Sequence, residues 1–310
     1  MAIVAIAGGT GGVGKTVVEH LQRPGAHKVF IVGRKVPAES IPGSPEFLVV
    51  DYANVESLTT ILQDHKIDTV VSTINLETDA GSQSQLSLIA AADKSQTTRR
   101  FIPSEFVSLI DEDDPSSGLG IGGWMPNARA LKETSLEYIR ISIGAFSDYW
   151  GMPHIKSNLK TFRWLLDMEK GIAVVPGSGN EKFTVTYSED LARFIVRLVD
   201  TDEKWPERGF LSGSDISVNE LVAIAERFRG SKMEIVYDPL ENLEKGDATL
   251  LWHPEDVTED EFKPMLAALC QMIITGACLL PDDDRRLDRR FPDIPLTSVE
   301  EIIAKAWGGK

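Results

Sequence analysis

Cysteine is scarce in this sequence of 310 residues, with only Cys270 and Cys278 present. Two cysteines make neither a disulfide framework nor a zinc site, and both lie in the apolar stretch LAALCQMIITGACLL. We therefore interpret them as packed thiols. Histidine is sparse as well, and four of the five histidines show no metal-ligand spacing: His20, His27, His65 and His253. No metal site is expected.

Positive charge and long apolar runs are also lacking. The chain has 32 basic and 47 acidic residues, a formal net charge of −15. Its densest basic stretch, DDDRRLDRR at 282–290, balances four Arg with four Asp, so it predicts a solvated surface and no nucleic-acid partner. No run reaches the roughly 18 apolar residues that span a bilayer. The first run breaks at Gly8, without the flanks of a signal peptide, so we expect a cytoplasmic protein with no membrane partner.

Short apolar runs do recur along the first half, alternating with helical patterns. The runs are β-branched and uninterrupted by polar residues, as is typical of strands covered on both faces. The alternation predicts βαβ units, and therefore an α/β fold built on a Rossmann-type, doubly wound parallel sheet. Strands are predicted at 2–7, 28–33, 47–50, 68–73, 99–104 and 138–143. Helices are predicted at 12–22, 54–65, 82–93 and 127–136.

The remainder of the chain is less regular. Residues 107–126, rich in Gly, Pro, Ser and acidic residues, show no periodicity and predict a long loop. A helix is predicted at 187–200, with Ser188 as its N-cap. Capping-box spacing predicts two further helix starts: Ser217 with Glu220, and Thr297 with Glu300.

The most informative local pattern is the glycine cluster GGTGGVG, where Gly8, Gly11 and Gly14 have the spacing G-x-x-G-x-x-G. The cluster follows a predicted strand, opens a predicted helix and begins the βαβ series, as a dinucleotide-binding turn requires. In such a turn the first glycine permits a tight bend. The second lets a pyrophosphate approach the backbone, and the third lets helix and strand pack closely.

Two alternatives use the same residues. The turn can be tight with nothing bound. Gly9, Gly14, Lys15 and Thr16 also fit the phosphate-loop pattern G-x-x-x-x-G-K-T. Against the phosphate loop stands the lack of an obvious magnesium partner after the third and later strands.

Arg34 and Lys35 follow the second predicted strand. Sites selective for NAD carry an acidic residue near this place, where it binds the ribose 2′-hydroxyl. Two cations instead suit a 2′-phosphate, because arginine can contact it in bidentate fashion. The pair predicts NADP(H), with two solvated charges as the alternative.

Several stretches together resemble the NmrA-like and isoflavone-reductase-like families, which are atypical members of the short-chain dehydrogenase/reductase superfamily. They are GGTGGVG, GRK, RRFIPSEF (99–106), GAFSDYWGMP (144–153) and VPGSGNEKFTVTYSEDLARFI (175–195). The resemblance covers residue 2 to about residue 240. It implies an NADP(H)-binding Rossmann domain at 1–150 and a smaller C-terminal α/β substrate domain at 151–310. Part of 184–220 is expected to pack back on the first domain, and the ligand cleft is expected between the two.

The resemblance also assigns site residues, position by position. Those that line the pyrophosphate are Gly8, Thr10, Gly11, Gly12, Val13 and Gly14. Those that hold the rest of the cofactor are Arg34 and Lys35 at the 2′-phosphate, Thr73 and Ile74 at the adenosine and ribose, and Pro103, Ser104, Glu105 and Phe106 beside the nicotinamide. Those of the substrate pocket are Phe146, Tyr149, Trp150 and His154. Ordinary core is the alternative for the aromatic residues, and a structural hydrogen-bond acceptor is the alternative for Glu105.

The match departs from the family at the acid–base group. Reductases of this group resemble one another in a lysine on the helix before the sixth strand. That place falls near Trp124 here, and the nearest lysine is Lys132, about two helical turns on. The superfamily's Tyr-x-x-x-Lys device, in which lysine lowers the pKa of tyrosine, is absent as well. Lys132, His154 and Tyr149 are the remaining candidates for proton transfer.

Three functions fit these observations. The first is an NADP(H)-dependent oxidoreductase that reduces a small aromatic or polyketide-like metabolite of secondary metabolism, with the cofactor supplying hydride. The second is a non-catalytic NADP sensor that acts through a protein partner, which the missing lysine favours. The third is a non-redox enzyme for dehydration, cyclisation or isomerisation. A small-molecule substrate is expected, and a homodimer or a regulatory protein partner stays open.

Overall fold

The computed structural model describes residues 1–23, 26–36, 43–110 and 123–309. The chain divides into two compact units, each made of several segments. The first unit consists of Met1–Phe106, Gly120–Ser142 and Leu191–Gly209, and the second of Val107–Leu119, Ile143–Asp190 and Phe210–Lys310. Residues 143–150 therefore count with the second unit, and residues 191–209 return to the first.

The first unit is built on a six-stranded sheet in the order β3-β2-β1-β4-β5-β6. All neighbouring strands run parallel, which confirms the predicted Rossmann-type α/β fold. The strands are β1 (Ile3–Ala7), β2 (Lys28–Gly33), β3 (Glu46–Val49), β4 (Thr69–Ser72), β5 (Arg100–Ile102) and β6 (Glu137–Tyr138). The strand order reverses between β1 and β4, and such a switch point is where open α/β sheets bind ligands.

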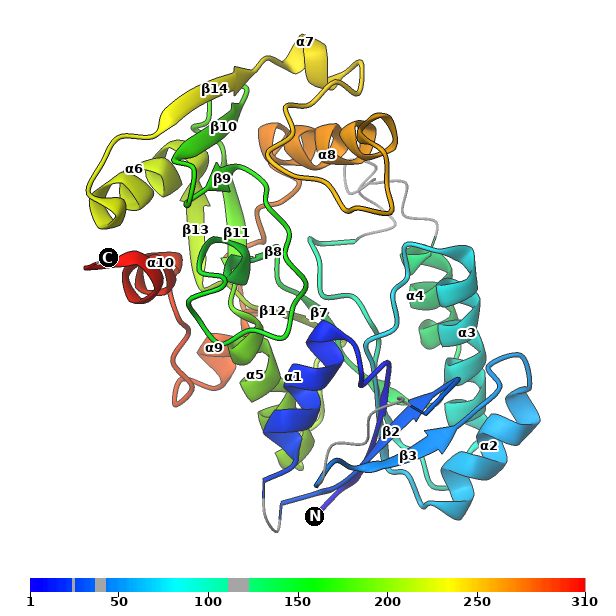
Figure 1. The fold of residues 1–310 in the computed structure, drawn as a ribbon. Helices are drawn as coiled ribbons and strands as arrows, with labels where there is room; N and C mark the ends of the chain where they lie inside the picture. The colour runs from blue at the N-terminus through cyan, green and yellow to red at the C-terminus, as the bar shows by residue number, and fades with distance from the viewer. Residues whose placement is uncertain (24–25, 37–42, 111–122, 310) are drawn as a thin grey trace. The chain divides into compact units, whose positions relative to one another are not determined.

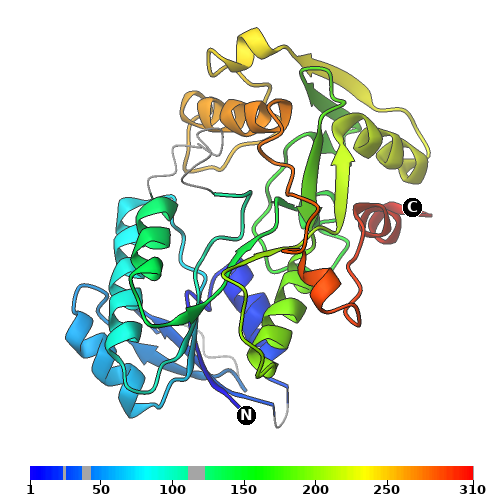
Figure 2. The ribbon, with the colours of Figure 1, turned by 180° about the vertical axis from the view of Figure 1, so that it is seen from behind.

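Helices cover both faces of this sheet. They are α1 (Gly12–Leu21), α2 (Val55–Asp64), α3 (Asp79–Lys94), α4 (Trp124–Lys132) and α5 (Ser188–Asp200). The helices α2, α3 and α4 lie together on one face, whereas α1 and α5 lie side by side on the other (Figure 1, Figure 2). This double cover explains the uninterrupted apolar runs. Successive strand residues such as Val70 and Val71 point to opposite faces, yet both are fully buried.

Most predicted elements of the first unit differ from the structure by one to three residues at their ends, and two of them differ further. The helix predicted at 127–136 begins three residues earlier and ends at Lys132. The strand predicted at 138–143 divides into β6 and β7 (Arg140–Ser142) because its two parts have different partners. Tyr138 pairs with Phe101 in the parallel sheet, whereas β7 pairs with β12 (Arg208–Phe210). Of the loop predicted at 107–126, residues 111–122 lie outside the described residues.

The second unit contains two three-stranded sheets, in the orders β14-β10-β9 and β13-β11-β8. Their strands are β8 (Ala145–Phe146), β9 (Leu166–Asp167), β10 (Ile172–Pro176), β11 (Lys182–Thr186), β13 (Ser214–Ser217) and β14 (Glu234–Asp238). Its helices are η2 (Ser147–Trp150), α6 (Val218–Arg229), α7 (Leu240–Leu243), α8 (Glu259–Ile274), α9 (Leu287–Arg290) and α10 (Val299–Trp307). The core between them includes the buried rings of Trp150, Trp164 and Phe183.

Capping boxes begin three helices of the second unit. Ser217 and Glu220 form the predicted box at α6. The box predicted at Thr297 and Glu300 is wrong by one residue, because α10 is capped by Ser298 with Glu301. The backbone N–H of Thr297 donates instead to Asp190 at 2.5 Å, and its hydroxyl donates to the same carboxylate at 3.1 Å. A third box, not predicted, opens α8: Thr258 with Glu261.

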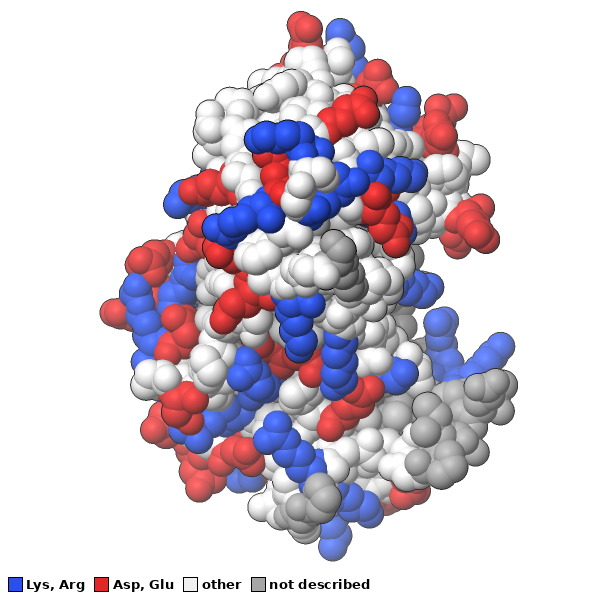
Figure 3. Space-filling view, turned by 60° about the vertical axis from the view of Figure 1, so that its left-hand side comes forward, with Lys and Arg blue, Asp and Glu red and all other residues white. Residues whose placement is uncertain are grey.

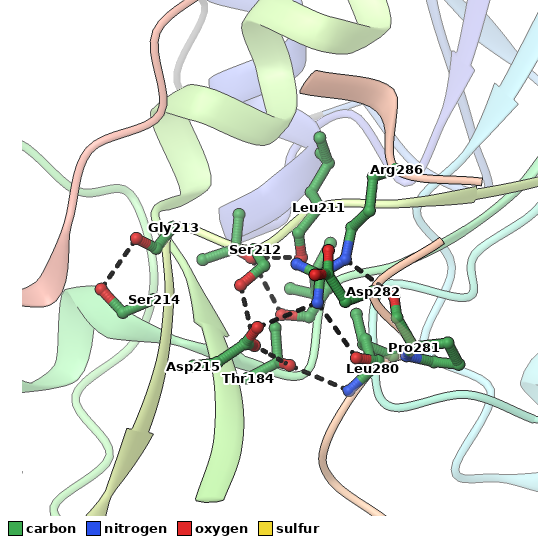
Figure 4. A network of polar contacts seen from close by, with 12 residues as sticks. Thr184, Leu211, Ser212, Gly213, Ser214, Asp215, Leu280, Pro281, Asp282 and Arg286 are labelled. Carbon is green, nitrogen blue, oxygen red and sulfur yellow. Dashed lines mark hydrogen bonds and ion pairs between the residues drawn. The ribbon is translucent and has the colours of Figure 1, made fainter. Parts of the chain in front are cut away.

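An ion pair between buried Arg286 and half-buried Asp215 holds the segment after α8 in place (Figure 4). The Arg286 side chain, 6% exposed, donates to Asp215 at 2.9 Å and to the carbonyl oxygens of Pro281 at 2.8 Å and Leu280 at 3.0 Å. The hydroxyl of Thr184 on β11 donates to Asp215 at 2.6 Å and accepts from the N–H of Leu280 at 2.9 Å. Every partner of this network belongs to the second unit, so the network stabilises the packing of that unit.

Candidate functional site

The glycine turn lies at the carboxyl end of β1. Gly8 has a φ of +77°, and a Cβ there would lie 2.8 Å from the carbonyl oxygen of Thr73. A Cβ on Gly14 would lie 2.3 Å from the Gly8 carbonyl oxygen and 2.5 Å from Thr73 Oγ1. Backbone conformation and close packing therefore require glycine at both positions.

Gly11 has no such structural requirement. Its φ is −79°, it is exposed, and the nearest atom to an added Cβ is the Gly8 oxygen at 3.3 Å. A side chain here would require the Gly8 carbonyl to shift by only a few tenths of an ångström, so glycine is needed far less for the fold here than at Gly8 and Gly14. Thr10 beside it is exposed, and Gly12 and Val13 are half-buried in the first turn of α1.

The N-terminus of α1 also lacks a side-chain cap. Gly11 is its N-cap, with no side-chain hydrogen bond and no acidic residue in the first turn. Side-chain oxygens cap α2, α3, α6, α8 and α10. The first N–H groups of a helix lack intrahelical acceptors and carry a partial positive charge. In α1 they can therefore bind an anion that approaches over Gly11.

The phosphate-loop alternative requires Thr16 to present its hydroxyl to a magnesium ion. Thr16 is fully buried, and its hydroxyl donates to the carbonyl oxygen of Gly12 at 3.1 Å. The structure therefore favours the dinucleotide reading of this turn over the phosphate loop.

Arg34 and Lys35 extend from the carboxyl end of β2, and both are exposed. Arg34 lies close enough to Tyr52 to lower the pKa of its phenol, although burial is the larger effect and raises that pKa to about 12. The Tyr52 hydroxyl donates to the carbonyl oxygen of Val32 at 3.4 Å. The cationic pair thus lies on the β2 side of the switch point.

Thr73 joins the ends of β1 and β4. Its N–H and its hydroxyl both donate to the carbonyl oxygen of Ala7 at 2.8 Å. Ile74 follows and is half-buried. These two residues therefore border the switch point on the side opposite Arg34 and Lys35.

The backbone of Ser104, after β5, is held by side chains from two helices. Its N–H donates to Gln85 Oε1 of α3 at 2.9 Å, and its carbonyl oxygen accepts from the indole N–H of Trp124 of α4 at 3.0 Å. Pro103 is buried and Ser104 half-buried. The loop is therefore fixed beside the end of β4 by contacts on both sides of one residue.

Glu105 is committed to a buried ion pair. Its two carboxylate oxygens each lie 2.8 Å from Nε of Arg140 on β7, and the two side chains are 1% and 4% exposed. Burial raises the pKa of Glu105, and the Arg140 guanidinium opposes that shift. With Phe106 also buried, this arrangement makes Glu105 a structural acceptor in the unit's interior.

The start of α4 is seated against the segment that follows β4. A Cβ on Gly123 would lie 2.0 Å from the carbonyl oxygen of Leu76, so only glycine fits. Nδ2 of Asn127 donates to the Gly123 carbonyl oxygen at 2.6 Å and to Ser82 Oγ of α3 at 3.0 Å. These contacts fix the position of Trp124.

Lys132 is the last residue of the same helix and is exposed. Because α4 runs without a break, eight residues separate it from Trp124, which is about 12 Å along the axis at 1.5 Å per residue. The structure therefore brings Trp124, and not Lys132, to Ser104.

The four residues predicted for the substrate pocket all lie in the second unit. Trp150 is 1% exposed and donates to the carbonyl oxygen of Trp164 at 3.1 Å, so it is core. Tyr149 is half-buried, 6.4 Å from the ring of Phe146. His154 is exposed, and its ring lies 4.7 Å from that of Trp307. A cavity of about 20 Å³ beside Tyr149 and Trp150 holds one water at most.

Two residues of the site were not predicted from the sequence: Gln85 and Arg140. Arg140 carried a usable signal, because an arginine between Ile139 and Ile141 in an apolar strand must find a partner when it is buried. Gln85 carried a weaker one, as a long amide in a helix that is otherwise small and apolar on its buried side.

Lys and Arg side chains are interspersed with Asp and Glu over the face in Figure 3. Within the described ranges, no three His, Cys, Asp or Glu side chains are grouped so that they could hold a metal ion. A membrane-crossing helix, long and apolar enough to span, is likewise not found among these residues.

Comparison with known proteins adds a family and a fold. Residues 2–260 match the model of the NmrA-like family. Oxidoreductase swnN of Metarhizium robertsii is 30% identical over 99% of this chain and 98% of that protein. Phenylcoumaran benzylic ether reductase TP7 of Nicotiana tabacum is 27% identical over 97% of each. The binary complex of leucoanthocyanidin reductase with NADPH from Vitis vinifera has the same fold, with a TM-score of 0.76 at 20% identity over 98% of this chain and 99% of that chain.

Proposed function

The chain belongs to the NmrA-like family, and from this premise we propose that it is an NADP(H)-dependent oxidoreductase that reduces a small organic metabolite. The relatives named as an oxidoreductase and as a benzylic ether reductase support a redox role. The names of the plant relatives support an aromatic substrate in particular. A polyketide-like substrate remains within the same proposal.

One observation carries the cofactor assignment. Arg34 and Lys35 follow β2 directly, beside the strand whose glycine turn opens α1 without a cap. A pyrophosphate over Gly11 would meet the uncapped N–H groups of α1, and a ribose 2′-phosphate on the β2 side would meet two cations. The residues present therefore fit NADP(H).

The protein's part in the reaction follows from these positions. Bound NADPH supplies the hydride. Gly11 and the N-terminus of α1 hold the pyrophosphate, Arg34 and Lys35 select the phosphorylated cofactor, and the Ser104 loop supports the reacting half. The predicted groups for proton transfer stay Lys132, His154 and Tyr149, although α4 places Lys132 far from Ser104. The predicted substrate contacts stay Phe146 and Tyr149.

Cofactor titration tests the first part of the proposal. We expect wild-type protein to bind NADPH more tightly than NADH, and Arg34→Ala to weaken NADPH binding alone. The expected loss is about 1.5–3 kcal/mol, or roughly 10- to 100-fold, for a charge-assisted phosphate contact. Arg99→Ala is the matched control, because Arg99 is an exposed arginine at the opposite, amino end of β5. Equal affinities of the wild type for NADPH and NADH contradict the assignment.

Turnover tests the second part. NADPH oxidation is followed against a panel of aromatic carbonyl, enone and polyketide-like compounds. Oxidation that depends on one of them, and that is lost in Gly11→Val, supports the reductase. Tight NADPH binding without oxidation over the whole panel would favour the non-catalytic sensor, and product formation without a change in NADPH would favour the non-redox enzyme.

A further inference from the structure

The indole of Trp124 occupies the end of α4 that meets the Ser104 loop, and we propose that it contacts the nicotinamide ring of bound NADP(H) and positions that ring. The inference rests on the proposed function, since it presupposes the cofactor. It assigns to α4 an aromatic wall at the reacting end of the site, in the place where sequence comparison expects a lysine.

The strand order indicates which half of the cofactor lies near Trp124. A doubly wound sheet binds the two nucleotide halves of a dinucleotide on either side of its switch point, here between β1 and β4. Arg34 and Lys35 place the 2′-phosphorylated adenosine half on the β2 side. The nicotinamide half therefore extends past Thr73, which follows β4, to the loop after β5 that contains Ser104.

Trp124 is held at that loop from two directions. Its indole N–H donates to the Ser104 carbonyl oxygen at 3.0 Å. Its backbone follows Gly123, which is pressed against Leu76 between β4 and α3. The residue stays half-buried despite these contacts, so it is not fully covered by the described chain. A large aromatic residue that is fixed but not fully covered suits contact with a flat ring such as nicotinamide.

The chemistry of the indole also shows that Trp124 does not supply a proton donor. An indole N–H is not an acid at neutral pH, and this one is committed to a carbonyl oxygen. Trp124 therefore orients and shields, and it donates no proton to the substrate. It is a positioning residue, and its removal should change how the nicotinamide is held.

Contact quenching tests the proposal without any substrate. Nicotinamide quenches tryptophan fluorescence at contact, so NADP⁺ is compared with 2′-phospho-ADP-ribose, which is the same ligand without nicotinamide. We expect NADP⁺ to quench the wild type more than the analogue does. In Trp124→Phe this difference disappears, while both ligands still bind by calorimetry. Trp205→Phe is the matched control, because the Trp205 indole also donates to a backbone carbonyl of the first unit, that of Leu198 at 2.9 Å.

Affinity gives a second reading. Trp124→Ala should weaken NADPH about threefold to tenfold, as expected for a lost aromatic contact, and Trp124→Phe should restore most of that loss. The proposal is overturned if Trp124→Phe keeps the full difference in quenching, or if Trp205→Ala weakens NADPH as much as Trp124→Ala does. Failure of the wild type to bind NADPH at all overturns the proposed function and this inference with it. If the wild type binds NADPH, but Trp124→Phe shows the same difference in quenching between NADP⁺ and 2′-phospho-ADP-ribose as the wild type, only this inference is overturned.

Discussion

Helix α1 of the first unit begins in the opposite way to helices α6, α8 and α10 of the second unit. In the second unit, α6, α8 and α10 each start with a complete capping box, so a side chain accepts from the helix and a glutamate returns the contact. In the first unit, α1 starts at Gly11 with no side-chain cap. Where the chain satisfies its own polar groups, it builds structure. At α1 the N-cap residue supplies no such acceptor, and the pyrophosphate of the proposed cofactor would take its place.

The largest expected effect on stability comes from the polar network around Arg286, in which the second unit satisfies its own polar groups. Arg286→Ala should lower the free energy of unfolding by about 2 kcal/mol, because half-buried Asp215 loses its cation and the carbonyl oxygens of Leu280 and Pro281 lose their donor. Arg289→Ala is the control: its pair with Asp282 is 48% and 74% exposed, so a loss below about 1 kcal/mol is expected. Chemical denaturation of the full chain measures both, and equal losses would contradict the argument.

Substitutions at two glycines of the turn should affect different properties, cofactor affinity in one case and stability in the other. Gly11→Val should reduce NADPH affinity on the order of 100-fold, through loss of charge-assisted contacts, and leave the melting temperature nearly unchanged. Gly14→Val should instead destabilise the protein, because its Cβ would lie 2.3 Å from the Gly8 oxygen. Calorimetric titration and thermal melting distinguish the two effects. Normal NADPH binding by Gly11→Val would show that the glycine cluster is only a turn.

The capping boxes permit a smaller test. Ser217→Ala should cost about 1 kcal/mol of stability and leave NADPH affinity as it was, because α6 begins in the second unit. Its counterpart is Gly11→Ser, which adds a cap to α1. We expect Gly11→Ser to change stability by only a few tenths of a kcal/mol and to weaken NADPH. If Gly11→Ser bound NADPH as well as wild type, the open helix end would not be the anion site.

The smallest expected effect is a dependence on acid pH. Hydrogen bonds from the capping Ser or Thr hold the pKa of three glutamates below the ordinary 4.5: Glu220, Glu261 and Glu301. A lowered folded-state pKa adds stability above the unfolded value, and this is lost as the pH falls below it. The triple Gln variant should therefore lose stability less steeply than wild type below pH 4.5. Parallel slopes in acid denaturation would contradict this.

Local patterns predicted the first unit's sheet well, because a buried parallel strand is apolar on both faces and is bounded by turns. β2 was predicted at its observed bounds of 28–33, and the glycine turn was recognised from its spacing. The bounds of α4 could not be predicted in the same way. Its start depends on Gly123 fitting against Leu76, which is 47 residues earlier in the chain.

The site's interior was the least predictable part. The sequence marked Glu105 as a candidate neighbour of the cofactor, but its partner Arg140 becomes visible only when β7 is placed. The segment TSVEE fits two overlapping capping boxes, and Asp190 decides between them by taking Thr297. In both cases a distant residue settles a choice that the local sequence leaves open.

The strand predicted at 138–143 is divided into β6 and β7, and this division has a consequence for the synthesis of the protein. β7 pairs with β12, and residues 191–209 belong to the same unit as the first 106 residues. During synthesis the first unit stays incomplete until residue 209 has left the ribosome, and by then the whole of residues 143–190 of the second unit has already emerged. A recombinant fragment that ends at residue 150 would lack all of α5 and all of β12, leaving β7 an unpaired edge. The first unit is therefore not one continuous stretch of sequence, and any fragment that contains all of it also contains residues 143–190 of the second unit.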